Sequence, residues 1–446
     1  MDATMAAPSL DRSPDSSRER IGTELRLPCG AVLKNRLAKA AMTEGLADSL
    51  NRATGRHLCL YERWAHNGFG LMLTGNVQVD RRQLERPGNI AVDGNAGFEA
   101  LRKLAAVGTR EGAHFWMQIN HPGRQTSAAI HPRPLSPSAI SLPTAEAACG
   151  AAQAMTRDQI RDVVRRFVRV ATVARDTGFT GVQIHAAHGY LLSNFLSPLA
   201  NARSDEYGGS LANRARLLLE IVAATRRALG ADFPISVKLN TADFQRGGFD
   251  EDESLQVLHW LSDAGIDLLE LSGGNYEQMS MVGLGEAAPS TGRAVAASTA
   301  AREAYFLAFA QRARPLVNMP LMITGGMRSL ATMDEALASG ACEVIGIGRP
   351  VCHAPDDCGP LLLSGPGMEL PAIERTLAMP RDALGPDIDE RSFKTIESFG
   401  LLGWFCLQLI RLGDGLEPDT ELSVFDALTG YERNETEALR RWSRPG

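Results

Sequence analysis

Eight short apolar runs, each followed by a helical pattern, constrain the fold of this 446-residue chain more than any other feature. An alternation of strands and helices predicts a parallel sheet, and eight repeats predict that the sheet closes into a barrel. The expected fold class is therefore α/β, a (β/α)8 TIM barrel with extended loops and a C-terminal helical extension. The eight runs are Leu37–Thr43, Leu71–Val79, Ala113–Asn120, Thr180–His185, Ile235–Asn240, Leu268–Ser272, Leu321–Thr324 and Glu343–Ile347.

The domain organisation follows from where this rhythm begins and ends. We expect a disordered tail over residues 1–22, the barrel over 23–365 and an extension packed on the barrel over 366–446. The serine-rich start lacks a basic segment followed by an apolar stretch, so it does not resemble a secretory signal. Length alone suggests two or three domains, but α/β barrels often exceed the usual domain size as one unit.

The composition indicates which kinds of partner and which cellular environment this chain can have. The net charge of −6, without a block of Lys or Arg, argues against a nucleic-acid surface. Seven cysteines without a C-x-x-C pair indicate reduced thiols and a cytoplasmic location. No run is long and apolar enough to predict a membrane span. The nearest, Phe399–Leu412, is interrupted by Gln408 and Arg411, so we expect a helix packed on the barrel or on a second copy in a homo-oligomer.

Two connections are long enough to be functional. His121–Met155 carries five prolines, and Gly273–Ala297 is rich in glycine and methionine. Both leave the carboxyl ends of predicted strands, so we expect both to overhang the mouth of the active site. After the first of them, Thr156 and Gln159 form the pattern of a capping box and predict a helix start.

The fourth run ends in three polar side chains, His185, His188 and Tyr190. Catalytic groups of such barrels lie at the ends of strands, so this position favours chemistry. Two imidazoles and a phenol can hold a carbonyl oxygen and offer a proton. A satisfied core histidine and half of a zinc site are the other interpretations. No second acidic or cysteine cluster stands at metal-ligand spacing to complete a zinc site, so we expect no metal.

Glycine-rich turns end the last two runs, Thr324-Gly325-Gly326-Met327 and Gly346-Ile347-Gly348-Arg349-Pro350. Barrel enzymes commonly bind a phosphate with the loops after strands 7 and 8. Glycine lets backbone N–H groups approach phosphate oxygens closely, and an arginine can add a bidentate charged contact. These two loops therefore predict a phosphate site.

Residues 184–215, IHAAHGYLLSNFLSPLANARSDEYGGSLANRA, closely resemble the flavin-dependent ene reductases of the old yellow enzyme family. The resemblance covers roughly residues 25–355. It implies non-covalent FMN and either NADH or NADPH as hydride donor. Larger relatives contain a Cys-x-x-Cys-x-x-x-Cys run for an iron–sulfur cluster, which is missing here, so the chain resembles the short, flavin-only form.

The resemblance also implies a set of cofactor-binding residues. Gln118 in WMQINHPGR matches the glutamine on the pyrimidine edge of the flavin ring, and Lys238 in ISVKLN matches a basic residue near N1 and O2 that is arginine in many relatives. Ala41 stands where many members have proline and Asn76 where they often have alanine. The full set is Ala40, Ala41, Met42, Thr43, Asn76, Gln118 and Lys238 around the ring, with Gly325, Gly326, Met327, Gly348 and Arg349 at the phosphate.

The reaction that the resemblance implies is ping-pong reduction of the C=C bond of an α,β-unsaturated carbonyl compound by NAD(P)H. His185 and His188 would bind the carbonyl oxygen, and Tyr190 would protonate the α-carbon. Three alternatives remain open from the sequence. They are another redox reaction (nitro reduction or oxidative demethylation of amines), a flavin-binding protein without turnover, and a zinc hydrolase on the same barrel.

Overall fold

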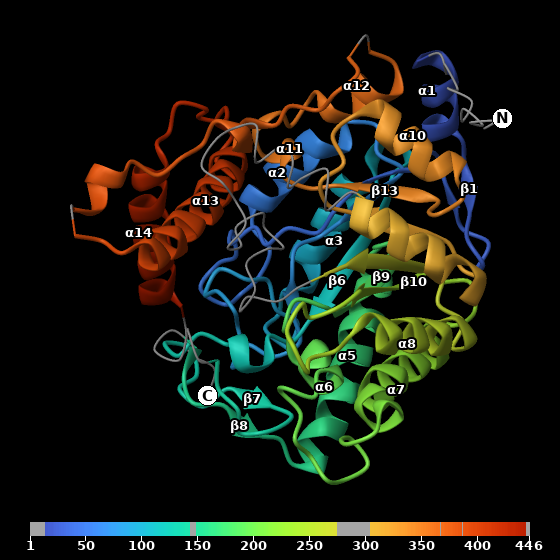
Figure 1. Cartoon of the computed structure of the whole chain (residues 1–446), viewed down its shortest axis with the longest axis vertical. Coiled ribbons are helices and arrows are strands. Elements are labelled where there is room, and N and C mark those ends of the chain that lie inside the picture. Colours follow the sequence, from blue (N-terminus) through green and yellow to red (C-terminus); the bar gives the residue numbers. More distant parts are fainter. Residues whose placement is uncertain (1–13, 143–148, 274–303, 366, 386, 443–446) are drawn as a thin grey trace, which may run out of the picture.

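A closed barrel of eight parallel strands forms the centre of the molecule in the computed structural model, which describes residues 14–142, 149–273, 304–365, 367–385 and 387–442 (Figure 1). Each strand pairs with the next along the chain, and β13 pairs with β3 to close the ring. The strands are β3 (Leu37–Lys39), β4 (Leu71–Leu73), β6 (His114–Asn120), β9 (Gly181–Ala186), β10 (Ile235–Asn240), β11 (Leu268–Ser272), β12 (Leu321–Thr324) and β13 (Val344–Ile347). The predicted (β/α)8 fold is confirmed.

The predicted runs coincide with the strands to different degrees. The fifth, sixth and seventh runs match β10, β11 and β12 from end to end. The second run divides into β4 and β5 (Val77–Gln78), which pairs with β6 beyond the end of β4. The first strand ends at Lys39, so residues 40–43 leave the sheet instead of extending it.

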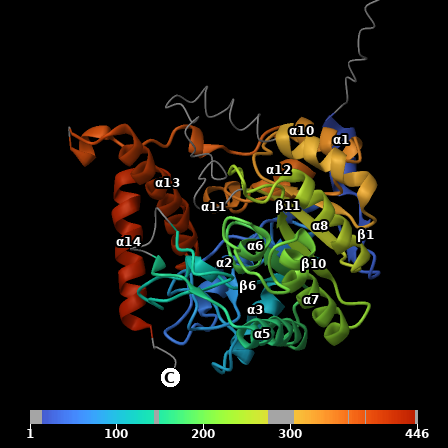
Figure 2. The same ribbon diagram turned by 60° about the horizontal axis from the view of Figure 1, so that its bottom comes forward.

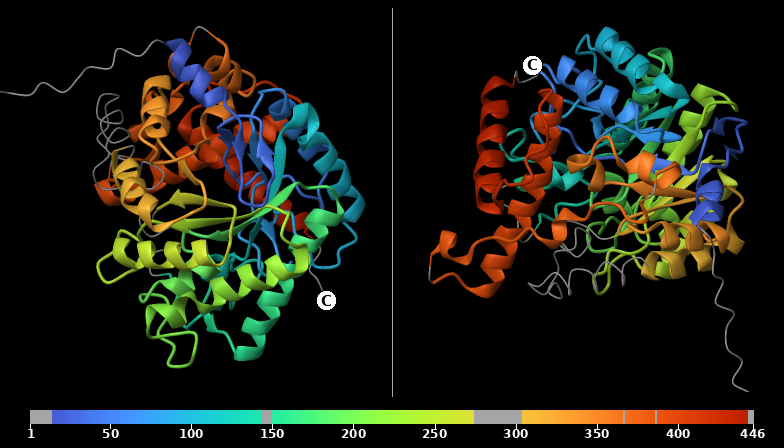
Figure 3. Two further views of the ribbon diagram at one scale, coloured as in Figure 1. Left: turned by 90° about the vertical axis from the view of Figure 1, so that its right-hand side faces the viewer. Right: turned by 90° about the horizontal axis from the view of Figure 1, so that it is seen from above.

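Helices surround the strands on the outside of the barrel (Figures 1 and 3). α5 begins at the predicted capping box: the Thr156 side chain accepts from the Gln159 backbone N–H, and the Gln159 side chain accepts from the Thr156 N–H. The other barrel helices are α2 (Gly55–Ala65), α3 (Phe98–Gly108), α6 (Leu191–Leu196), α7 (Leu211–Leu229), α8 (Glu251–Asp263), α10 (Leu330–Ala338), α11 (Pro350–His353) and α12 (Cys358–Leu363), and α5 spans Arg157–Asp176.

The amino-terminal segment corrects the expected disordered tail. Residues 14–22 form helix α1 (Pro14–Gly22), and Ile21 in it is fully buried. Arg20 Nε lies 2.8 Å from Asp334 Oδ1 of α10, and Arg18 donates to the Gly367 carbonyl at 2.9 Å. These partners lie more than 300 residues away, so a serine-rich start carries no local sign of them. Residues 1–13 are outside the described residues.

A small antiparallel hairpin follows, β1 (Leu25–Arg26) and β2 (Val32–Leu33), which the apolar runs did not predict. Its Leu25 and Leu33 pack with barrel residues such as Trp116. The Cys29 N–H, in the turn, donates to Asp267 just before β11. The hairpin therefore covers the amino-terminal end of the barrel, opposite the ends where catalytic groups are expected.

The C-terminal extension is a pair of packed helices, α13 (Glu390–Gly413) and α14 (Val424–Arg441), on the side of the barrel away from α1 and α10 (Figures 1 and 2). Arg86 Nη2 lies 2.7 Å from Glu435 Oε1 and anchors α14. By length and composition α13 could cross a membrane, contrary to the expectation for this segment. However, 61% of its apolar window is buried within the fold, so packing accounts for its composition.

Candidate functional site

The three polar residues predicted to form the catalytic centre lie together at the carboxyl end of β9. His185 Nε2 and His188 Nδ1 are 3.1 Å apart, and the rings of His185 and Tyr190 meet edge to face at 4.9 Å. His188 adopts a left-handed backbone (φ +63°), and its N–H donates to Asn240 Oδ1 at the end of β10. This bond stabilises a backbone conformation that residues other than glycine rarely adopt. The His188 imidazole is thereby turned back toward His185.

A hydrogen-bonded chain runs through both histidines. Asn76 donates to Glu85 Oε2 at 2.7 Å, and its Oδ1 lies 2.9 Å from His185 Nδ1. At the far end His188 Nε2 lies 2.6 Å from Ser272 Oγ. A carboxylate only accepts, so the Asn76 amide turns its N–H toward Glu85 and its oxygen toward His185. His185 then carries its proton on Nδ1 and offers Nε2 as an acceptor.

Glu85 was not among the predicted site residues, and Asn76 was assigned to the flavin. The Asn76 side chain contacts His185 and also lies 3.3 Å from the Tyr190 hydroxyl, so the predicted flavin residue stands beside the histidine pair. Thr43, another predicted ring contact, donates to Glu85 Oε1 at 2.6 Å and is thereby linked to the same cluster. Glu85 stands in a polar segment, RRQLERPG, in which no local pattern distinguishes it from a surface charge.

Burial keeps both imidazoles neutral at neutral pH. Desolvation lowers the pKa of His185 well below its usual value, and the neighbouring His188 and Lys238 lower it further. The pKa of His188 is lowered in the same way, by burial and then by Lys238. The pair therefore offers lone pairs and N–H groups to a ligand, and no positive charge of its own.

A buried ion pair lies beside the histidines inside the barrel. Lys238 on β10 is the register neighbour of His185 on β9, and its Nζ lies 2.9 Å from Glu270 Oε1 on β11. Glu270 is fully buried and Lys238 is 5% exposed, so Lys238 is not a surface charge. The sequence analysis missed Glu270, although a single charge in the apolar run LLELS was a visible signal for a buried partner.

Two glutamines continue from this pair toward the predicted cofactor edge. Gln183 on β9 donates to Glu270 Oε2 at 2.8 Å, and Gln118 on β6 donates to Gln183 Oε1 at 2.7 Å. The predicted Gln118 and Lys238 are thus joined through two residues that the sequence analysis did not assign. Within the described residues no donor reaches Gln118 Oε1, which leaves that oxygen as an acceptor for a ligand.

The glycine-rich turns lie on neighbouring strands, β12 and β13. Gly325 and Gly326 have φ of +129° and +78°, a backbone that requires glycine, and a Cβ at Gly348 would meet no atom within 4 Å. Met327, which ends the first of these turns, is buried.

The predicted Arg349 lies in this region with an arginine that was not predicted, Arg328. Arg328 donates to Glu374 Oε1 at 2.6 Å, and Arg349 Nη2 lies 4.0 Å from the same atom. Burial opposes ionisation of Glu374, but the Arg328 and then the Arg349 charge hold its pKa below the usual value. Two guanidinium groups against one carboxylate leave a net positive site, which fits an anion such as phosphate.

The loop after β3 contains the remaining residues that were predicted to contact the flavin ring. The Ala40 N–H donates to the Ile347 carbonyl of β13 at 2.8 Å, which holds this loop beside the phosphate turns. Ala41 and Met42 are half-buried, and Met42 Sδ lies 3.6 Å from Cys352 Sγ. An acceptor oxygen on Gln118, the buried Lys238 cation and two glycine-rich turns beside arginines thus line the barrel, and this set of groups fits FMN.

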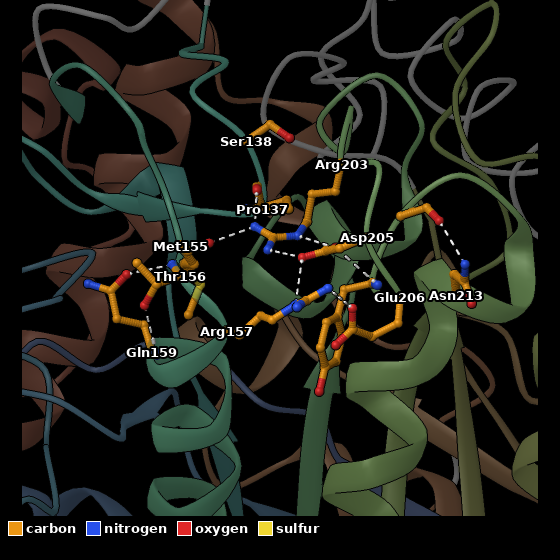
Figure 4. A network of polar contacts seen from close by, with 12 residues as sticks. Pro137, Ser138, Met155, Thr156, Arg157, Gln159, Arg203, Asp205, Glu206 and Asn213 are labelled. Atoms are coloured by element: carbon orange, nitrogen blue, oxygen red, sulfur yellow. Dashed lines mark hydrogen bonds and ion pairs between the residues drawn. The ribbon is translucent and has the colours of Figure 1, made fainter.

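The motif that follows Tyr190 braces the surrounding loops (Figure 4). Arg203 donates to the carbonyls of Pro137 and Met155 at 2.9 and 2.7 Å and pairs with Asp205. Pro137 and Met155 belong to the long connection over residues 121–155, so Arg203 ties that connection to the loop after β9. Residues 143–148 of this connection and 274–303, which contain most of the second one, are outside the described residues.

No three His, Cys, Asp or Glu side chains converge as a possible metal site in the part of the chain that the structure describes.

The chain is similar in sequence to known flavin oxidoreductases. Residues 29–357 match the sequence model of the NADH:flavin oxidoreductase / NADH oxidase family. The chain is 36% identical over 352 residues to the NADH-dependent flavin oxidoreductase iliE of Hypocrea jecorina, covering 74% of this chain and 86% of that protein. It is 27% identical to the NADPH dehydrogenase of Bacillus subtilis, over 73% of this chain and 89% of that protein.

Solved structures share the fold. A 2-naphthoyl-CoA reductase complexed with 2-naphthoyl-CoA has a TM-score of 0.70 at 25% identity, over 77% of this chain and 52% of that chain. The old yellow enzyme homologue of Zymomonas mobilis has a TM-score of 0.64 at 22% identity, over 84% of this chain and 98% of that chain. Morphinone reductase has a TM-score of 0.65 at 20% identity, over 80% and 92%.

Proposed function

Because the chain belongs to the NADH:flavin oxidoreductase / NADH oxidase family and is an oxidoreductase of the old yellow enzyme type, we propose that it uses FMN to reduce α,β-unsaturated carbonyl compounds. NADH or NADPH is the hydride donor, and the two half-reactions follow a ping-pong order. The observation that supports this proposal best is the cluster of His185, His188 and Tyr190 beside the buried Lys238.

The described residues fit FMN in two places. Gln118 and Lys238 would hold the pyrimidine edge of the ring, since they offer an acceptor and a cation at the same end of the barrel. Gly325, Gly326 and Arg349, with Arg328, would hold the phosphate. FMN, when bound, supplies the hydride carrier that the side chains of this protein cannot replace.

The histidine pair binds the substrate oxygen. When an oxygen atom takes the place of the bond between His185 and His188, the His188 Nδ1–H is free to donate to it. That bond stabilises the negative charge that develops on the oxygen as the neighbouring C=C bond is reduced. Ser272, hydrogen-bonded to His188 Nε2, supports the tautomer that keeps the proton on Nδ1.

Tyr190 supplies the proton for the α-carbon. Its ring packs on His185 and its hydroxyl lies 3.3 Å from Asn76 Nδ2, so the phenol is held beside the oxygen-binding pair. The side chain is almost fully buried, which keeps the proton donor away from bulk water.

Single-turnover kinetics of Tyr190→Phe test this function. FMN reduction by NAD(P)H should remain nearly normal, and re-oxidation by cyclohex-2-enone should slow by roughly 10²- to 10⁴-fold, the usual range for a lost general acid. Re-oxidation by oxygen needs no carbon-bound proton and serves as the control. Equal enone rates in the variant and the parent would exclude Tyr190 as the donor, and turnover with an amine but not with an enone would exclude the proposed reaction.

A further inference from the structure

Glu270 is a buried charge to which the proposed reaction gives no role. It lies on β11 with no exposed surface, and its two oxygens contact different partners. Oε1 pairs with Lys238 at 2.9 Å, and Oε2 accepts from Gln183 at 2.8 Å. A buried carboxylate is costly, and hydrophobic replacements of buried ion pairs are often neutral or stabilising, so stability alone is a weak explanation for it.

The ion pair between Lys238 and Glu270 changes the net charge that a ligand at this end of the barrel meets. Lys238 alone would present a full positive charge in a medium of low dielectric constant. With Glu270 at 2.9 Å, the ligand meets a nearly neutral pair whose cationic end is Lys238. The attraction of this pair for an added negative charge on a ligand is therefore much weaker than that of an isolated lysine.

Glu270 also sets the direction of the two amides. Since a carboxylate only accepts, Gln183 must turn its amide nitrogen toward Glu270 and its oxygen toward Gln118. Gln118 then donates to that oxygen, and its own Oε1 remains available within the described part of the chain. A ligand N–H group, but not a ligand carbonyl, matches that oxygen.

We propose that Glu270 is a positioning residue that sets both the charge and the hydrogen-bond polarity of the surface on which the FMN ring would lie. It neutralises Lys238 and, through Gln183, makes Gln118 an acceptor. The consequence is a lower reduction potential of bound FMN than an isolated lysine would produce. The inference rests on the FMN site of the proposed function and deepens it.

Three variants test the proposal: Glu270→Gln, Lys238→Met and the double variant. The measurement is the ratio of the Kd values for oxidised and reduced FMN, obtained from FMN titrations and the potential of the bound cofactor. Glu270→Gln leaves an unneutralised lysine, so this ratio should rise by about tenfold or more, because reduced FMN carries the additional negative charge. Lys238→Met leaves an unneutralised carboxylate, and the ratio should fall by a similar factor.

The double variant separates this account from a simpler one. If the pair is nearly neutral, removing both charges should return the ratio to within about threefold of the parent value. If Lys238 acts on FMN as an isolated cation, the double variant should lower the ratio as much as Lys238→Met does, which would overturn the proposal. Glu343→Gln, which breaks the Arg314 pair before β13, is the control for loss of a partly buried ion pair.

The remaining outcomes are also decisive. If Glu270→Gln and Glu343→Gln only lower the melting temperature and both keep the parent ratio, Glu270 is structural and the proposal fails while the proposed function stands. A parent protein that retains no FMN overturns the proposed function and this inference together. If Glu270→Gln does not fold, the comparison of Lys238→Met with the double variant still distinguishes a neutral pair from an isolated cation.

Discussion

Replacing Glu85 with glutamine should change which ligands the histidine pair prefers. The Glu85 carboxylate accepts from Asn76 at 2.7 Å and from Thr43 at 2.6 Å. It thereby keeps the Asn76 oxygen toward His185, whose Nε2 must then accept. With His188 Nδ1–H as donor, the parent pair offers one acceptor and one donor, so a carbonyl oxygen gains one hydrogen bond from the pair and a hydroxyl group can gain two.

Glutamine can donate to Asn76, so the Asn76 amide can reverse and His185 can carry its proton on Nε2. The pair then offers two donors, and an acceptor-only oxygen gains one hydrogen bond. A hydrogen bond is worth roughly 1 kcal/mol, so affinity for a ketone relative to a phenol should rise by a factor of about five.

Titrations of the FMN-loaded protein with cyclohexanone and with phenol, followed by flavin absorbance, measure this preference. Thr43→Val is the matched control, because it removes the Thr43 bond to Glu85 and the longer 3.3 Å contact with Asn76 but leaves the carboxylate opposite Asn76. Its ketone-to-phenol ratio should stay near the parent value. If Glu85→Gln weakens both ligands equally, Glu85 only supports the loop and the tautomer argument is refuted.

Two further predictions concern the phosphate site and the buried histidines. Arg349→Ala should weaken FMN binding by about tenfold or more through lost charged contacts, and an unchanged Kd would show that the phosphate lies elsewhere. Burial lowers the pKa of His57 and of His121 to about 4, and those of His185 and His188 well below the usual value. Unfolding returns each imidazole to a pKa near 6.5, so protons bind the unfolded chain preferentially below that pH. The free energy of unfolding should therefore fall as pH decreases from about 6.5 toward 4, by about 1.4 kcal/mol per pH unit for each such histidine. Urea denaturation at pH 7 and pH 5 measures this, and equal values would contradict the buried neutral state.

The local pattern of the chain determined the barrel. Apolar runs of strand length separated by helical patterns are readable within short windows, and closure follows from their number. The capping box at Thr156 was readable for the same reason, because both of its partners lie within one helical turn. The histidines and Tyr190 were found because one strand end carries all three within six residues.

Only the tertiary structure decided which polar groups meet. Asn76 reaches His185 across 109 residues, and Lys238 meets Glu270 only because β10 and β11 are neighbours in register. The sequence analysis predicted a disordered tail where helix α1 lies. The ion-pair partner of this helix, Asp334, is 314 residues away, so no local pattern indicates the contact. Burial can be read from a local apolar pattern, whereas the partner of a buried charge depends on strand order and register, which emerge when the whole barrel closes.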